Sequence, residues 1–164
     1  MLCAPQACGK RLGMLRLSKK LMFAIEAVLD IAYNAGSEPV QSREITRRQG
    51  IPRRYLEQVL QQLVRAGILA GVRGPRGGYR LARERRKITI GEIVRIVRAM
   101  ESAEDPIADP AGSVLGHKVV RPLWQDLQRE VMERLDLVTI EELCLRARQA
   151  NLESEAFHKL DYVI

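Results

Sequence analysis

The segment Gly50-Ile51-Pro52 divides an amphipathic pattern into two helices, and this break constrains the fold more than any other feature of the chain. Before it, residues 42–49 predict a short helix with Ser42 as N-cap and Glu44 in the first turn, where the helix dipole favours an anion. After it, a helix opens on proline and ends at Gly67. Its apolar residues form one stripe: Leu56, Val59, Leu60, Leu63 and Val64. Two helices joined by a tight glycine-containing turn predict a helix-turn-helix.

Two strand-like runs follow these helices directly. Residues 68–72 and 79–81 flank the sequence RGPRGG, and strand patterns around a Pro/Gly loop predict a β-hairpin. Upstream, Ser18 is expected to cap a helix that runs to about Ala35. Downstream, the T-x-x-E pattern of Thr89 to Glu92 predicts a further helix start.

The second half of the chain predicts a loop and two more helices. Residues 101–117 are acidic and rich in proline and glycine, which is typical of a loop. A long amphipathic helix follows, and a second T-x-x-E pattern, Thr139 to Glu142, opens a final helix through Arg148. The long helix carries one apolar stripe: Val120, Leu123, Trp124, Leu127, Val131 and Leu135.

The predicted fold class is therefore mainly α with a small β-hairpin wing. We expect a winged helix-turn-helix domain over residues 14–100, a loop at 101–117 and dimerisation helices over 118–150. Residues 1–13 are expected to be a disordered extension, with Met14 as a plausible natural start, and residues 151–164 a tail. The apolar stripe of the long helix supports pairing with a second copy, and packing against the first helix is the alternative.

The charge of the chain is divided unevenly between its halves. Residues 14–100 carry 18 Lys and Arg against 7 Asp and Glu, whereas residues 101–164 carry 7 against 13. A basic half of this kind is expected of a protein that binds a polyanion, and a merely basic surface is the alternative. The sequence shows neither a signal peptide nor about 20 consecutive apolar residues, so we expect a cytoplasmic protein without a membrane partner.

The polar face of the helix after Pro52 carries side chains that can form hydrogen bonds with base edges. Arginine and glutamine have paired hydrogen-bonding groups that match guanine and adenine, and glutamate can accept from cytosine. A solvated polar face is the alternative. The candidate base contacts are Arg54, Glu57, Gln58, Gln61 and Arg65. Arg53 and Arg47 are better placed for phosphates, and Ser42 and Arg43, at the start of the preceding helix, complete the predicted DNA-binding set on these two helices.

The hairpin loop adds a second basic element. Arg73, Pro75 and Arg76 lie in RGPRGG, where glycines allow close approach of backbone to phosphate and an arginine can enter a narrow minor groove. An ordinary surface turn is the alternative. Helix, short helix, helix and basic hairpin together predict binding to double-stranded DNA.

The run IPRRYLEQVLQQLVRAGILAGVRGPRGGYRLAR resembles the Rrf-type (IscR/NsrR/CymR-like) bacterial winged-helix transcriptional regulators. RLSKKLMFAIEAVLDIA, ITIGEIVRIV and PLWQDL resemble the same family, and the likeness covers about residues 14–150. The resemblance implies a homodimer whose long helices pair and whose two winged helices read a near-palindromic operator. It places Arg54, Tyr55 and Glu57 among the recognition-helix contacts and Arg73 at the minor groove.

One departure from the family concerns its iron–sulfur cluster. Many members hold the cluster with three cysteines in the loop before the long helix, and some use a histidine three residues before the tryptophan. Here residues 101–117 contain no cysteine, and that histidine position is Arg121. We therefore expect no cofactor at this loop. A small molecule, or a protein partner such as a metabolic enzyme, is expected to be the effector.

Other candidate sites are weaker. A group of Glu104, Asp105, Asp109 and His117 could attract a metal, but a solvated acidic loop is favoured. Cys3 and Cys8 are expected to have no role. Cys144 is expected to be a small buried hydrophobe.

The sequence contains no catalytic motif, so an enzyme is not expected. The alternative functions are an iron–sulfur or redox sensor with unusual ligands, and a winged helix that docks a protein instead of DNA.

Overall fold

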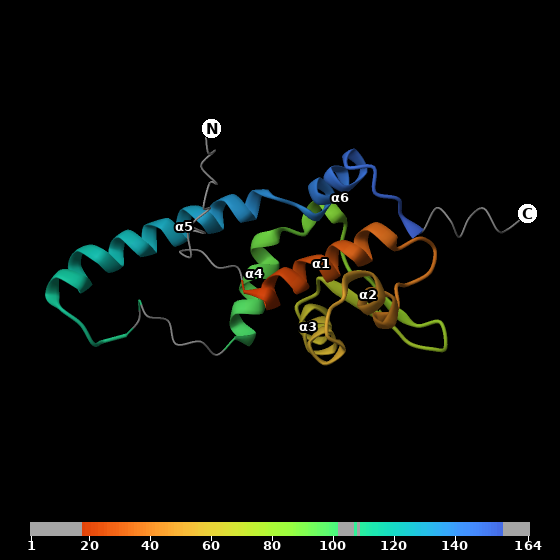
Figure 1. Cartoon of the computed structure of the whole chain (residues 1–164), viewed down its shortest axis with the longest axis horizontal. Coiled ribbons are helices and arrows are strands. Elements are labelled where there is room, and N and C mark those ends of the chain that lie inside the picture. The colour runs from red at the N-terminus through yellow and green to blue at the C-terminus, as the bar shows by residue number, and fades with distance from the viewer. Residues whose placement is uncertain (1–17, 102–106, 108, 156–164) are drawn as a thin grey trace, which may run out of the picture.

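A computed structural model describes residues 18–101, 107 and 109–155. Three helices lead into the hairpin: α1 (Lys19–Asn34), α2 (Ser42–Gln49) and α3 (Arg53–Arg65). The antiparallel strands β1 (Leu69–Val72) and β2 (Gly78–Leu81) follow, with Leu69 opposite Leu81 and Val72 opposite Gly78. Then come α4 (Ile90–Met100), α5 (Arg121–Leu137) and α6 (Ile140–Gln149). Figure 1 shows α1 in the middle of the body and α5 as a long arm that projects from it.

Local signals explain most of the helix ends. The Ser18 hydroxyl accepts from the backbone N–H of Leu21 at 3.1 Å, and Thr89 and Glu92 form the expected capping box. Gly50 ends α2 in the left-handed conformation at φ 65°. The expected cap at Ser42 is wrong. Ser42 is the first residue of α2, and the preceding Gln41 donates its backbone N–H to the Glu44 carboxylate at 2.9 Å.

The core forms where the apolar stripes of these helices meet. All four inward positions of α3, from Leu56 to Leu63, are fully buried, as the helical period predicts. They share one cluster with residues of α1, α2, α4 and the hairpin. The hairpin is tied to the body by paired hydrogen bonds between Val40 and Tyr79, at 2.8 and 2.9 Å. A Cβ atom at Gly78 would lie 2.4 Å from the Val40 carbonyl oxygen, so only glycine allows this approach.

The final helix belongs to the body, which differs from the expected division of the chain. Residues 118–150 are expected to form the dimerisation helices, yet Ile140 and Cys144 of α6 are buried in the core. The backbone N–H of Ile140 also donates to the Ile88 carbonyl at 2.9 Å. Among the described residues, the helices that lie outside this core are confined to the arm formed by α5 and the turn before it.

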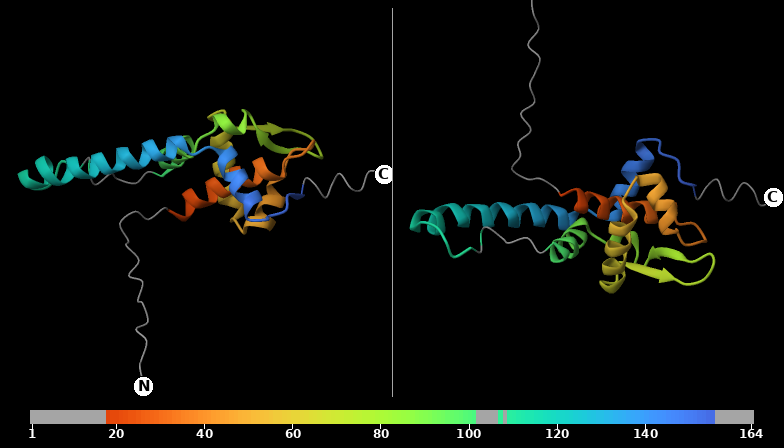
Figure 2. Two further views of the ribbon diagram at one scale, coloured as in Figure 1. Left: turned by 90° about the horizontal axis from the view of Figure 1, so that it is seen from above. Right: turned by 60° about the horizontal axis from the view of Figure 1, so that its bottom comes forward.

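The arm begins earlier than the sequence predicts. Helical structure starts at Val114, inside the expected loop, and continues through a π-helical turn, Gly116–Val120, into α5. Pro122 explains the π-helical turn. Its ring displaces the carbonyl four residues back, and it has no N–H to donate to that carbonyl. Only the C-terminal end of α5 packs on the body, where Asp136 pairs with Arg95 of α4 at 2.6 and 2.7 Å. The views of Figure 2 show the N-terminal half of α5 reaching well beyond α4.

A candidate nucleic-acid interface

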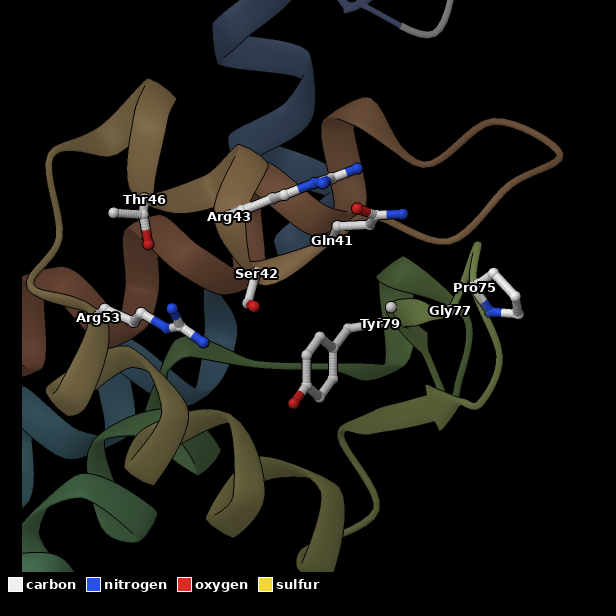
Figure 3. Close-up of a pocket in the computed structure, with 9 residues that line it drawn as sticks. Gln41, Ser42, Arg43, Thr46, Arg53, Pro75, Gly77 and Tyr79 are labelled. Atoms are coloured by element: carbon white, nitrogen blue, oxygen red, sulfur yellow. The ribbon is translucent and has the colours of Figure 1, made fainter.

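A cleft of about 390 Å³ lies between α2, the start of α3 and the hairpin. Its lining combines predicted and unpredicted residues: Gln41, Ser42, Arg43, Thr46, Arg53, Pro75, Gly77, Gly78 and Tyr79. Figure 3 shows the Arg53 side chain and the Tyr79 ring directed into the space between these elements, with Pro75 on the hairpin beyond them. The cleft therefore brings the helix-turn-helix and the wing together on one side of the molecule.

The outward face of α3 meets this cleft at Arg53, whereas Arg54 and Gln58 line a second cleft with Lys20 and the end of α4. Five of its predicted base-reading residues are exposed: Arg54, Glu57, Gln58, Gln61 and Arg65. They are held outward because Leu56, Val59, Leu60 and Leu63 occupy the opposite face of the helix in the core. Arg53 donates to the Glu57 carboxylate at 2.8 Å, one helical turn away, and both side chains of this pair are exposed.

The hairpin loop presents its basic residues to solvent. Arg73, Pro75 and Arg76 are all exposed. Arg76 is loosely paired with Glu38 at 3.6 Å. An exposed pair of this kind contributes little, which leaves the Arg76 guanidinium able to exchange partners. Gly74 adopts φ 117°, a conformation that side chains disfavour, so the tip of the loop depends on glycine.

Tyr55 differs from the other predicted contacts. It is half-buried, its ring lies 6.2 Å from that of Phe23, and its hydroxyl donates to the Lys20 carbonyl at 2.6 Å. Burial, with a smaller effect of the charge on Glu101, raises the pKa of Tyr55 to about 12, so this hydroxyl stays a donor. The structure thus shows Tyr55 fastening α3 to the beginning of α1.

Several cleft residues carried no signal that sequence reasoning used. Thr46 lies on α2, and Gln41 immediately precedes that helix. Tyr79 lies on β2, and Gly77 immediately precedes that strand. The Thr46 hydroxyl is the one buried side-chain oxygen or nitrogen without a partner in the described part of the chain. Only the spacing of Thr46 from Ser42, one helical turn, could have placed it on the cleft side.

A network of ion pairs fixes α2 against α1. The Asp30 side chain is completely buried and accepts from Arg48 at 2.6 and 2.9 Å and from Gln49 at 2.8 Å. Burial lowers the pKa of Arg48, but Asp30 and Glu155 outweigh it and raise the pKa above its ordinary value. This network sets the angle between α2 and the body, and therefore the position of one wall of the cleft.

The loop before the arm closes around an arginine. The Arg121 guanidinium donates to the carbonyl oxygens of Asp109 and Ala111, and one of its nitrogens lies 2.9 Å from Nδ1 of His117. Within residues 18–101, 107 and 109–155, no three His, Cys, Asp or Glu side chains gather as metal ligands do. Glu104 and Asp105 lie outside the described residues. An iron–sulfur cluster is held by thiolates. The described loop residues instead place the Arg121 guanidinium beside carbonyl oxygens, and they do not fit such a cluster.

Cys144, the cysteine within the described residues, is not exposed to redox partners. Cys144 is buried among core residues, and burial raises the pKa of its thiol, which keeps it protonated and unreactive. This agrees with the expected role as a small hydrophobe. Cys3 and Cys8 lie outside the described residues.

The apolar stripe of the arm is largely open. Val120, Leu123 and Leu127 have 47%, 58% and 40% of their surface exposed, and Trp124 and Val131 are half-buried. Leu135, near the C-terminal end, packs against the core. The alternative of packing against the first helix does not account for the stripe, because α5 meets the body mainly at α4. No helix in the described parts of the chain combines the length and the apolar character that crossing a membrane requires.

Comparison with known proteins agrees with this architecture. Residues 17–146 match the Rrf2 family, described as an iron-dependent transcriptional regulator. The HTH-type transcriptional regulator IscR of Vibrio cholerae is 36% identical over 133 residues, which cover 80% of this chain and 76% of the relative. That of Cronobacter sakazakii is 37% identical over 131 residues, or 79% of this chain and 80% of the relative.

Solved structures show the same fold. IscR of T. potens superposes with a TM-score of 0.68 at 31% identity, covering 86% of this chain and 94% of that one. CymR, the global cysteine regulator of B. subtilis, superposes with a TM-score of 0.65 at 30% identity, covering 81% and 98%. The predicted family and the mainly α fold with a two-stranded wing are confirmed, and the family is regulatory, not enzymatic. The chain belongs to the Rrf2 family of transcriptional regulators.

Proposed function

We propose that this regulator is a homodimer that binds double-stranded DNA at a near-palindromic operator, with one winged helix on each half-site. The observation that carries the proposal is the shared cleft, in which Arg53 at the start of α3 faces the hairpin residues Pro75, Gly77 and Tyr79. An α-helix fits the major groove, and the hairpin can then reach the adjacent minor groove.

In this proposal the residues of α3 read the bases. Arg54, Gln58, Gln61 and Arg65 offer donors and acceptors to purine edges, and Glu57, held by Arg53, accepts from cytosine. Ser42, Arg43 and Arg76 line or flank the cleft and contact phosphates, which set the register without reading sequence. Tyr55 acts as a positioning residue for α3 because its hydroxyl is already bonded to Lys20.

Selection of bound duplexes from a random pool tests the proposal. We expect an enriched motif with two inverted half-sites, and affinity that falls steeply as salt concentration rises. Equal affinity for all duplexes at matched salt would contradict sequence-specific regulation. Binding of a protein but of no duplex would favour the docking alternative.

Replacing Arg73 with alanine is expected to weaken operator binding by about 1–3 kcal/mol, because a minor-groove arginine loses its contacts with bases and phosphates. Fluorescence anisotropy with the selected duplex measures the change. Arg148→Ala on α6 removes the same charge outside the cleft and the arm, and serves as the control. Equal affinities for the two variants would place the hairpin loop away from DNA.

The arm formed by residues 114–137 is the proposed dimer interface. Seven of its large apolar side chains are exposed along the helix, and a surface of this kind marks an interaction site: Val114, Leu115, Val119, Val120, Leu123, Leu127 and Leu137. A second copy supplies a matching stripe, and twofold symmetry suits a near-palindromic site. The DNA-binding domain in this proposal comprises α1 to α4, the hairpin and α6.

We further propose that the regulator binds DNA without an iron–sulfur cluster at the loop before the arm, where Arg121 meets the carbonyls of Asp109 and Ala111. A small molecule or a protein partner would then supply the signal. Protein purified without oxygen is expected to be colourless and free of iron, and to bind its operator equally before and after chelator treatment. A visible absorption band that chelation removes together with operator binding would contradict this, and would favour a sensor with unusual ligands.

A further inference from the structure

The end of the described chain lies across the helix-turn-helix, outside the residues that match the family. We name residues 152–155 the C-terminal strap. The Tyr33 hydroxyl donates to the Leu152 carbonyl at 2.6 Å, and the Ser154 hydroxyl donates to the Tyr33 carbonyl at 2.7 Å. The backbone N–H of Glu155 donates to the Asn34 side-chain oxygen at 3.0 Å. These contacts hold the strap against the end of α1.

The strap carries a carboxylate to two arginines of α2. Glu155 accepts from Arg47 at 2.9 Å and from Arg48 at 2.6 Å. The two arginines differ in environment: the Arg48 side chain is only 14% exposed and already holds Asp30, whereas the Arg47 side chain is 69% exposed. Arg47 is therefore the partner that can leave Glu155 at little cost.

In the proposed complex with DNA, Arg47 lies next to the phosphate backbone. It follows Arg43 by one helical turn, so the two arginines share a face of α2, and Arg43 lines the cleft. A duplex bound at the cleft brings phosphates to this face, and a phosphate and the Glu155 carboxylate then meet at the same guanidinium.

We infer that Glu155 competes with a DNA phosphate for Arg47 and so lowers the affinity of the regulator for every duplex, whatever its sequence. This inference rests on the proposed function. Where Glu155 keeps Arg47, one cation is withheld from the counterion exchange that drives binding. Where phosphate takes Arg47, Glu155 loses one of its two ion pairs and keeps only Arg48. Either case weakens binding without changing base recognition, because phosphate contacts carry no sequence information.

The variant Glu155→Gln tests this directly, because the amide keeps the size of the side chain and the backbone contacts of the strap. We expect operator and unrelated duplex to bind about three- to tenfold more tightly at low salt, with the same ratio between them. The slope of log affinity against log salt is expected to steepen by about 0.9, the value for one added phosphate contact. Thermal unfolding of the variant verifies that the fold is kept.

Two controls separate competition from other effects. Glu141→Gln on α6 makes the same change in net charge away from α2 and outside the arm, and is expected to leave the salt slope unchanged. In an Arg47→Gln background, Glu155→Gln is expected to produce no further change, because the contested guanidinium is gone.

The outcomes are distinct. Equal affinity and slope for Glu155→Gln and Glu141→Gln overturn the inference. Weaker binding together with a lower unfolding temperature also overturns it, because the strap would then be purely structural. A wild-type chain that binds no duplex overturns the proposed function, and the inference with it. A wild-type chain that binds its operator and is unaffected by Glu155→Gln overturns the inference alone.

Discussion

Replacement of Arg48 with methionine is expected to lower the free energy of unfolding by about 3–5 kcal/mol. The reason is Asp30, whose side chain is completely buried in the structure and lies 2.6 Å from the Arg48 guanidinium. Methionine fills a similar volume but leaves that carboxylate without its main counter-charge, and an uncompensated buried charge is more costly than the loss of an exposed ion pair. Urea denaturation followed by circular dichroism measures the change.

A double replacement shows that the charge, and not the volume, is responsible. The variant Asp30→Leu with Arg48→Met removes both charges and is expected to recover most of the lost stability, since a buried pair can be exchanged for apolar groups at little cost. Arg53→Met, at a side chain that is 81% exposed, is the matched control and is expected to stay within about 0.5 kcal/mol of wild type. If Arg48→Met were equally neutral, the network would not hold α2 in place.

The second large effect is expected at the arm. The double variant Leu123→Glu with Leu127→Glu is expected to turn the proposed homodimer into a monomer and to weaken operator binding by about a hundredfold or more. Each charge enters a stripe that two copies would bury together, and a monomer loses the gain in effective concentration from holding two half-sites at once. Light scattering and anisotropy with the full operator measure the two changes.

The fold of each subunit should survive this double replacement. Leu123 and Leu127 are 58% and 40% exposed within one chain, so charge at these positions removes little intramolecular packing. Gln125→Glu adds a negative charge off the stripe of the same helix and is expected to stay dimeric. A double variant that remains dimeric at micromolar concentration would show that the subunits pair through another surface.

Local patterns predicted the elements because their causes lie within a few residues. The capping box of Thr89 and Glu92, the left-handed Gly50 and the stripe of α3 are each decided inside one or two helical turns. The cap of α2 was misplaced by one residue because Ser42 is a better cap by type, whereas Glu44 fastens the N–H of Gln41. Sequence pattern could not assign α6, because a short amphipathic helix fits a core and an interface equally well.

The candidate site was predictable only in part, for a related reason. Which face of α3 points outward follows from periodicity, so its exposed polar residues could be chosen in advance. Tyr55 sits beside them in sequence but bonds to Lys20, more than thirty residues away. The cleft arises from the packing of the hairpin on Val40, and no local pattern records that contact.

The C-terminal strap also has a practical consequence for shortening the gene. Family boundaries suggest a stop codon near residue 146, before the strap begins. Such a truncation removes the partners of the Tyr33 hydroxyl and of the Asn34 side-chain oxygen, and leaves the Arg48 guanidinium with Asp30 alone of its two carboxylates. The shortened regulator would then differ from the full chain in rigidity and in surface charge at α1 and α2. DNA affinities measured on the shortened protein would not apply to the full chain.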